Sequence, residues 1–145
     1  MKCKYCNKEF EKRASLVQHE IRCSHNPNKI EQRTFHKGSY KGIRCDSSWE
    51  LAYVVWCVEH NIPIRRCNDR LKYVFNNEEH IYCPDFVVNE SQIVEVKGSA
   101  KYSKQWQTKY EQYPDVKVLY EKDIQPYLNY CRNKYGYEFW NILYD

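Results

Sequence analysis

No run of apolar residues in this 145-residue chain approaches the length of a membrane span, and its N-terminus lacks the apolar core of a secretory signal. Internal repeats and low-complexity tracts are also missing. We therefore expect an intracellular protein with no membrane partner. With 42% hydrophobic and 16% aromatic residues, the composition predicts a globular fold rather than a disordered chain.

The missing secretory signal also argues against a disulfide-stabilised scaffold, although the chain has 8 cysteines. Three of them, Cys3, Cys6 and Cys23, lie near histidines at the N-terminus. The other five are scattered, and we predict that they are buried, reduced thiols: Cys45, Cys57, Cys67, Cys83 and Cys131.

Acidic residues are scarce in the first third of the chain. Residues 1–44 carry 11 Lys and Arg against 4 Asp and Glu, a net charge of +7, whereas residues 45–145 carry 12 against 15, a net charge of −3. The basic front end favours contact with a polyanion such as nucleic acid. A basic face that contacts only solvent would give the same charge.

Residues 1–26 contain the ligand spacing of a zinc finger. Two residues separate Cys3 from Cys6, and three separate His19 from Cys23. Side chains four positions apart lie on one side of a helix, so both can reach the same ion. Zn²⁺ would supply the stability that so small a unit cannot gain by burial. His25 is the alternative fourth ligand, although it lies just before a helix-breaking Asn-Pro pair.

This module resembles the ββα finger family, with Phe10 and Leu16 at the positions of its small apolar core. In that family the leading residues of the helix face a DNA groove. By this register four residues would point toward DNA: Lys12, Arg13, Ser15 and Gln18. A single finger binds few base pairs, so we interpret it as an arm that adds affinity. The alternative is a structural or protein-contact role.

Residues 27–44 lack periodicity and carry several bases, which favours a basic linker before a domain over residues 45–145. Hydrophobic spacing in that domain predicts helices over residues 46–61, 101–113 and 123–136. Two strand-like runs begin at Ile62 and Leu71. Three more cover residues 81–88, 92–98 and 116–120. We interpret the order as helix, three strands, helix, strand, helix, an α/β (α+β) core with a mixed sheet.

Acidic and basic residues interrupt two of these apolar runs. Side chains alternate along a strand, so Glu95 and Lys97 share one face of "IVEVKG". Asp85 follows Pro84 at the start of the preceding strand. If the two strands pair as a hairpin, Asp85 and Glu95 come close together, and two carboxylates repel unless a cation lies between them. Oxygen ligands of this kind suit Mg²⁺ or Mn²⁺.

Pro84-Asp85 followed after nine residues by Glu95-Val96-Lys97 resembles the signature of the PD-(D/E)XK nucleases. The resemblance implies a restriction-endonuclease-like core, a central mixed sheet flanked by helices. It also implies that Asp85 and Glu95 bind the metal, that the Val96 carbonyl helps, and that Lys97 acts on the attacking water. In this superfamily a glutamate on the first core helix often completes the site, and Glu50 matches it.

Over roughly residues 47 to 120 the chain is similar to the phage endonuclease I group, which cuts branched DNA. The shared stretches are Ser47-x-x-Glu50, "YCPDF", "VEVKG" and "KYEQYPDVKVLY". Lys109 falls where that group has a basic residue on the helix after the catalytic strand, and we predict it to contact DNA. A phage origin would mean the cytoplasm of a bacterial host. The resolvases of this group lack a zinc finger, which leaves the substrate open between branched and linear DNA.

Each of these residues also has a purely structural interpretation. Glu50 fits the capping box Ser47-x-x-Glu50, Asp85 a turn cap, Glu95 with Lys97 an exposed ion pair, and Lys109 a solvated helix charge. Three neighbours are weaker still: Gln105 could make a polar contact in the site, whereas His80 and Tyr82 fit the surface of a strand.

The resemblance predicts a Mg²⁺- or Mn²⁺-dependent endonuclease that hydrolyses DNA phosphodiester bonds, site-directed as in homing or repair enzymes. Two alternatives are a structure-selective junction resolvase and a zinc-finger DNA-binding protein with an inactive core. A homodimer is the simplest way for one small active site per chain to cut both strands. RNA in place of DNA stays an open alternative.

Overall fold

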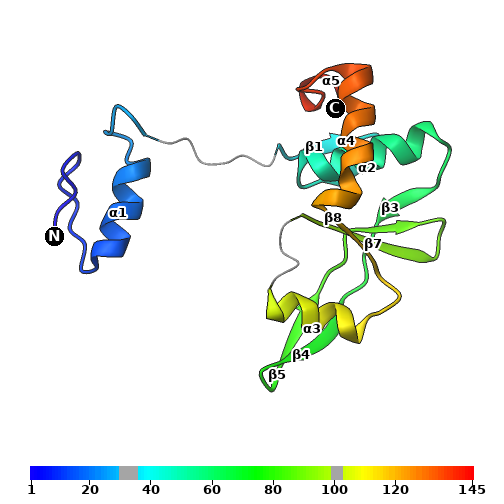
Figure 1. Ribbon diagram of the computed structural model, residues 1–145, viewed down its shortest axis with the longest axis horizontal. Helices are drawn as coiled ribbons and strands as arrows, with labels where there is room; N and C mark the ends of the chain where they lie inside the picture. The colour runs from blue at the N-terminus through cyan, green and yellow to red at the C-terminus, as the bar shows by residue number, and fades with distance from the viewer. Residues whose placement is uncertain (30–35, 99–102) are drawn as a thin grey trace. The chain divides into compact units, whose positions relative to one another are not determined.

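The computed structural model describes residues 1–29, 36–98 and 103–145. It is a mixed α+β protein with several sheets, which confirms the predicted class, and it divides into two compact units, Met1–Thr34 and Phe35–Asp145 (Figure 1). Within the described ranges, no helix is both long enough and apolar enough to cross a membrane.

The first unit has very little apolar core. Its helix α1 (Arg13–Arg22) has no buried residue, and a single antiparallel bridge joins the two extended segments that precede it. Phe10 and Leu16, the predicted core pair, are only half-buried, and the Phe10 ring lies 4.7 Å from the His19 ring. Among the described residues of this unit, the buried side chains are Cys3, Cys23 and Asn26.

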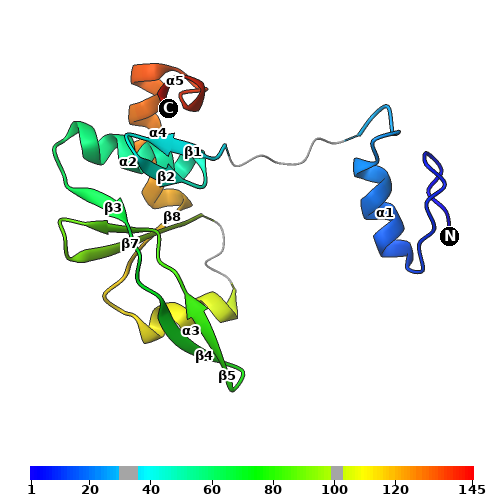
Figure 2. The same cartoon turned by 180° about the vertical axis from the view of Figure 1, so that it is seen from behind.

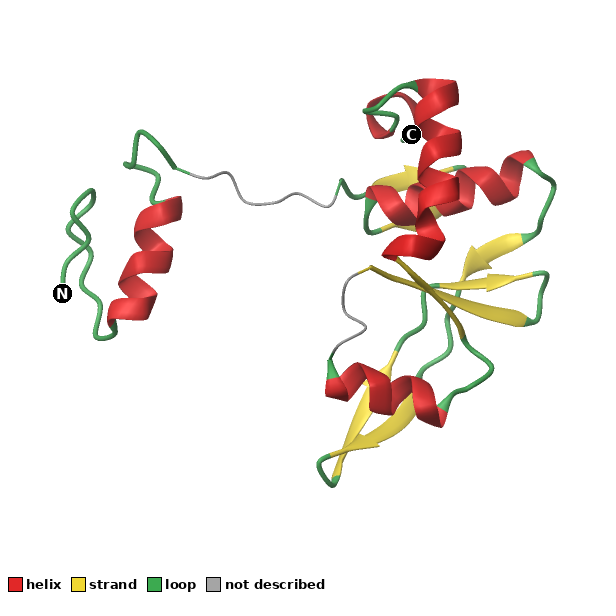
Figure 3. Cartoon of the chain, in the orientation of Figure 1, coloured by secondary structure: helices red, strands yellow, loops and turns green. Residues whose placement is uncertain are grey.

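A four-stranded mixed sheet forms the centre of the second unit, in the order β3-β6-β7-β8 (Figure 3). Its strands are β3 (Ile64–Arg66), β6 (Phe86–Val88), β7 (Gln92–Gly98) and β8 (Lys117–Tyr120). The first three are antiparallel, and β8 joins β7 in parallel. The predicted hairpin between β6 and β7 is confirmed, and Asn89 and Glu90 at its turn have the positive φ angles, 52° and 65°, that tight hairpins favour.

Two helices, α2 (Ser48–Glu59) and α4 (Glu121–Tyr135), pack on each other, and α4 also contacts β7 and β8. In both views they lie on one side of the sheet, whereas α3 (Lys104–Gln112) lies on the other side, against a separate hairpin (Figure 1, Figure 2). That hairpin joins β4 (Leu71–Phe75) to β5 (Glu78–Tyr82). The core side chains without exposed surface include Leu51, Val54, Val55, Phe86, Ile124 and Phe139.

The structure corrects the strand predicted over residues 81–88, which is divided between β5 and β6. The chain leaves the first strand at Cys83-Pro84, where proline offers no N–H for a ladder hydrogen bond. Tyr82 and Pro84 point inward, so Cys83 between them is exposed. The prediction of five buried thiols is therefore right for the other four and wrong for Cys83.

The last long helix begins before its predicted start. The Asp123 carboxylate accepts a hydrogen bond from the Tyr120 N–H at 3.0 Å and caps α4 at Glu121. Because the helix begins two residues before the predicted start, Pro126 lies inside it rather than in its first turn. A short fifth helix, α5 (Trp140–Leu143), follows near the C-terminus.

Part of the predicted linker is folded. Residues 38–45 form a hairpin of β1 (Gly38–Tyr40) and β2 (Ile43–Cys45), which turns at Lys41 and Gly42 with positive φ angles. The C-terminus closes over this hairpin, because the Asp145 N–H donates to the Ser39 carbonyl at 2.8 Å. The Tyr144 ring lies so close to Gly38 that a Cβ there would come within 2.6 Å of it.

Candidate functional site

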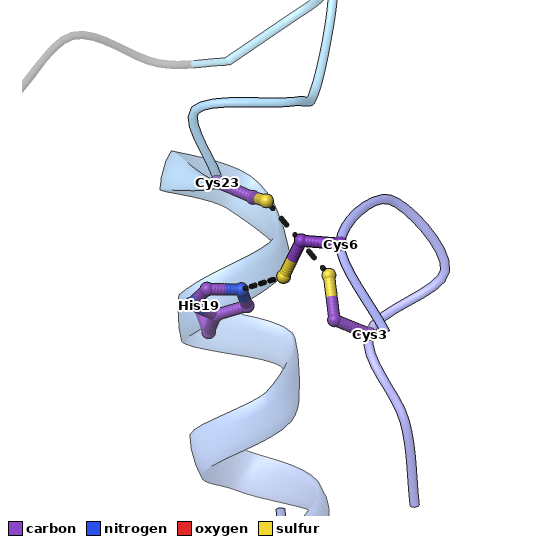
Figure 4. A group of neighbouring side chains, drawn as sticks. All are labelled: Cys3, Cys6, His19 and Cys23. Carbon is purple, nitrogen blue, oxygen red and sulfur yellow. Dashed lines mark hydrogen bonds between the residues drawn. The ribbon is translucent and has the colours of Figure 1, made fainter. Parts of the chain in front are cut away.

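The four predicted zinc ligands come together in the first unit (Figure 4). Their ligand atoms all lie within 4.8 Å of one another, with Cys6 Sγ 3.2 Å from His19 Nε2 and Cys3 Sγ 3.9 Å from Cys23 Sγ. His19 lies in the last turn of α1 and Cys23 caps the helix, so the helix presents both to one point. Three sulfurs and one imidazole nitrogen are a ligand set that suits Zn²⁺.

The geometry decides between the two candidates for the fourth ligand. Cys23 belongs to the ligand group, whereas His25 is exposed and its Nδ1 lies 3.2 Å from Ser24 Oγ. A metal ion such as zinc can therefore be held by Cys3, Cys6, His19 and Cys23. The four residues predicted to face DNA are all exposed, as such a contact requires: Lys12, Arg13, Ser15 and Gln18.

In the second unit, three acids come from three separate elements. Glu50 lies in the first turn of α2, Asp85 just before β6, and Glu95 in the middle of β7. Glu50 and Glu95 are each only 6% exposed, which is rare for carboxylates without partners. The interpretation of Glu95 with Lys97 as an exposed ion pair is therefore wrong.

Asp85 is fixed by the end of the β6–β7 ladder. The last paired residues are Phe86 and Val94, and beyond them the Val96 N–H donates to Asp85 Oδ2 at 2.8 Å instead of to a backbone carbonyl. The Asp85 carbonyl accepts from the Cys67 N–H at 2.9 Å. The aspartate thus extends the sheet with its side chain.

Glu50 keeps only half of the predicted capping box. Its N–H donates to Ser47 Oγ at 3.1 Å, which caps α2. Its carboxylate instead accepts from Arg66 Nη1 at 2.7 Å and from the Ser47 hydroxyl at 3.3 Å. Glu50 therefore turns its charge toward β3, where Arg66 is the last residue.

Burial and mutual repulsion raise the pKa of all three acids. Burial, with the nearby charge of Glu95, raises the pKa of Asp85 to about 7. Burial and the charge of Asp85 raise the pKa of Glu50 to about 7, although Arg66 acts in the opposite direction. Burial also raises the pKa of Glu95, against the hydrogen bond that Tyr82 donates to it at 2.7 Å. Carboxylates in such surroundings favour a cation.

Lys97 lies at an irregularity in the sheet. Val96 pairs with Leu119 and Gly98 with Tyr120, so Lys97 is the extra residue of a β-bulge between β7 and β8. Its Nζ lies 3.1 Å from the centroid of the Trp106 ring. Burial lowers the pKa of Lys97, and the charges of Glu95 and Asp85 partly oppose that change.

Lys109 is buried rather than exposed, with 7% of its surface accessible. Its Nζ lies 4.2 Å from the centroid of the Tyr82 ring and 5.0 Å from that of Tyr110. Burial lowers its pKa, while the charge of Glu95 raises it. The alternative of a solvated helix charge is therefore wrong, and the predicted DNA contact gains no support because so little of Lys109 is accessible.

Sequence reasoning missed two residues of this region and undervalued a third. Nothing in the sequence marks Arg66 or Trp106, because a strand-end arginine and a helical tryptophan are common on any protein surface. Tyr82, a weak candidate from sequence, holds Glu95 directly. His80 and Gln105 lie away from the acids. His80 stacks on Tyr73 of the β4–β5 hairpin, and the Gln105 amide donates to the Tyr73 hydroxyl at 2.9 Å.

The acids provide the oxygen atoms that a divalent cation prefers, but they do not lie close enough together to form a compact ligand group. Asp85 and Glu95 offer hard oxygen ligands, and the buried hydroxyl of Tyr110, which interacts electrostatically with both, has no hydrogen-bond partner. Among the described residues, however, only the finger ligands form a compact group of three or more. Arg66 already places a positive charge against Glu50 and Asp85.

Two surface depressions, of about 250 and 410 Å³, contain none of these residues. Tyr113 and Val116 line the smaller depression, and Pro63 and Arg65 line the larger one. Comparison of the chain with protein-family models, curated proteins and solved structures gave no match. The functional interpretation therefore depends on the residues and their geometry alone.

Proposed function

We propose that this protein is a Mg²⁺- or Mn²⁺-dependent DNA endonuclease with a PD-(D/E)XK core and an N-terminal zinc finger. The observation that carries the proposal is the pairing of β6 with β7, which brings the partly buried carboxylate of Asp85 beside the buried carboxylate of Glu95, with Lys97 two residues further along. A strand order of two antiparallel pairings followed by a parallel one, with α2 before the sheet, supports a restriction-endonuclease-like core.

In this proposal Asp85, Glu95 and the Val96 carbonyl hold the catalytic metal, with Glu50 as a further ligand. The metal supplies a Lewis acid that stabilises charge on the phosphate and lowers the pKa of the attacking water. Tyr82 fixes the orientation of Glu95 through its hydrogen bond, and the Val96 N–H does the same for Asp85. Both carboxylates are therefore positioned before substrate arrives.

Lys97 provides a positive charge from the chain itself for the proposed reaction. As water forms its bond to phosphorus and a phosphorus–oxygen ester bond breaks, negative charge builds up on the phosphate oxygens. The ammonium of Lys97, held near Asp85 and Glu95 by the bulge, can orient the water or stabilise that charge. The finger and the basic residues up to Arg44, with their net charge of +7, would bind the DNA backbone beside the cut.

The test is cleavage by the zinc-loaded full chain on supercoiled plasmid and on a synthetic four-way junction, with Mg²⁺, Mn²⁺ or EDTA. Glu95→Gln should reduce cutting by about 10³-fold or more while DNA binding stays within about twofold. Glu90→Gln, an exposed acid in the same hairpin, is the matched control and should cut normally. Equal loss of cutting and binding in Glu95→Gln would contradict the assigned role. The preferred substrate would separate a site-directed enzyme from a resolvase.

One observation favours a second candidate, a DNA-binding protein with an inactive core. Arg66 already provides a positive charge to Glu50 and Asp85 without any metal. DNA binding with no cutting of either substrate in Mg²⁺ or Mn²⁺ would favour this candidate.

A further inference from the structure

Arg66 is the point where three acidic segments meet. Its guanidinium lies 2.7 Å from Glu50 Oε1, 3.6 Å from Asp46 Oδ2 and 3.8 Å from Asp85 Oδ1. The centre of the guanidinium also lies 4.8 Å from the centroid of the Phe86 ring. Only 18% of the side chain is exposed, so the cation is largely removed from water and its surroundings are acidic.

These contacts differ in strength. The bond to Glu50 is a short, charge-assisted hydrogen bond, whereas those to Asp46 and Asp85 are near the outer limit of an ion pair. Arg66 is therefore anchored on Glu50 and Phe86 and held loosely against Asp85. A small shift of the guanidinium would free the Asp85 carboxylate without moving β3, the strand that carries Arg66.

We propose that Arg66 is an internal cation that neutralises Glu50 and Asp85 in the metal-free protein and competes with the divalent ion for these carboxylates. This inference rests on the proposed function in one respect, the assignment of Asp85 and Glu95 as the metal site. A guanidinium and a divalent ion repel each other strongly at contact distance in a partly buried site. Metal binding must therefore displace Arg66 from Asp85, and the cost of that displacement weakens the apparent metal affinity.

The competition explains why the acids do not form a compact ligand group. Glu50 Oε1 and Asp85 Oδ1 are held apart by the width of a guanidinium, because each contacts a different Nη atom of Arg66. With the guanidinium gone, repulsion between the two carboxylates would be relieved by another cation or by protonation of one of them. Arg66 is thus a positioning residue that keeps the site assembled before the metal arrives.

The experiment measures Mn²⁺ binding to the zinc-loaded full chain by titration calorimetry, without DNA. Arg66→Met keeps an apolar stem to pack on Phe86 but removes the charge, and we expect it to bind Mn²⁺ about tenfold or more tightly than the wild type. Arg66→Lys keeps the charge and should lie close to the wild type. Arg65→Met, which removes an exposed arginine one position earlier on β3, is the matched control and should not change the affinity.

Asp85→Asn in each background identifies the site, because Mn²⁺ binding that it does not reduce occurs elsewhere. An Arg66→Met protein that is folded but binds Mn²⁺ no more tightly than the wild type overturns the inference. If Arg66→Met fails to fold, Arg66→Gln serves in its place under the same criterion.

The same titration separates this inference from the proposed function. Metal-dependent cutting by the wild type with unchanged affinity in Arg66→Met refutes the competition and leaves the nuclease. Tighter Asp85-dependent binding in Arg66→Met with no cutting of any DNA supports the competition and refutes the nuclease. If no protein of the series binds Mn²⁺ through Asp85, both are wrong.

Discussion

The two units of this molecule differ in what can stabilise their folds. The first unit has a complete set of soft metal ligands and no buried apolar side chain apart from cysteine among its described residues. The second has an extensive apolar core of helices α2 and α4 packed on a sheet, and its acids contact a cation of the chain itself. We therefore expect the stability of the first unit to depend on a bound ion and that of the second on burial.

This difference also separates the roles of metal in the two units. In the finger, a metal ion bound by the four ligands would be part of the fold, because the described residues of that unit have almost no apolar core. In the second unit, the fold is complete without metal, and an ion at Asp85 and Glu95 would serve chemistry alone. All four tryptophans of the chain lie beyond residue 35, so tryptophan fluorescence follows the second unit selectively.

The largest expected effect comes from breaking the zinc site. Cys23→Ala should unfold the finger, because structural zinc contributes on the order of 10 kcal/mol to such units. The fluorescence unfolding midpoint of the second unit should not change. Backbone amide NMR of the full chain checks the finger, and urea unfolding followed by tryptophan fluorescence checks the second unit. His25→Ala, outside the ligand group, is the control and should leave the finger folded. A finger that keeps its spectrum in Cys23→Ala would show that the ion is not what holds it.

A core truncation should sharpen the comparison from the other side. Leu128→Ala removes a buried side chain of α4 and leaves a cavity, so the free energy of unfolding of the second unit should fall by about 3 kcal/mol. Urea unfolding followed by tryptophan fluorescence measures this loss. Val17→Ala in α1, where the side chain is 44% exposed, should change the free energy of unfolding of the first unit by less than about 0.5 kcal/mol. Because that unit has no tryptophan, its urea unfolding is followed by backbone amide NMR. Comparable losses in the two variants would mean that the finger has an apolar core after all.

How much could be predicted from the sequence follows the same division. The finger ligands follow two local spacings, one in the turn before α1 and one at the end of that helix, so Cys3, Cys6, His19 and Cys23 were predictable without any knowledge of tertiary structure. The β6–β7 hairpin and the mixed sheet were predictable as well, because alternation and a short turn fix the register. Each of these features follows a pattern that the sequence itself displays, either ligand spacing or alternation.

What the sequence could not reveal depends on contacts between distant segments. Arg66 reaches Glu50 across 16 residues and Asp85 across 19, and no periodicity links them. The burial of Lys109 was not predictable, because it comes from the rings of Tyr73 and Tyr82 on the β4–β5 hairpin. The bulge at Lys97 is equally invisible, since it arises from pairing with β8.

The smallest expected effect tests whether charge adds to burial in the second unit. Glu59 at the end of α2 accepts hydrogen bonds from Tyr130, Tyr135 and Lys134 of α4. Burial alone would raise its pKa, but these bonds outweigh burial and lower the pKa to about 2. A carboxyl whose pKa is lower in the folded than in the unfolded state adds stability above the unfolded value of about 4.3, and loses it as pH falls toward 2.

Glu59→Gln should therefore reduce the free energy of unfolding by about 1 kcal/mol at pH 7, a modest value because Lys134 is half exposed and solvent screens the pair. The difference from the wild type should shrink between pH 4.5 and pH 3, because the unfolded wild-type chain takes up a proton at Glu59 in this range while the folded protein keeps the charge. Urea unfolding at several pH values measures it, with the exposed Glu111→Gln as the control. A gap that stays constant down to pH 3 would mean that the contribution of Glu59 comes from packing between α2 and α4, and that burial alone stabilises this unit.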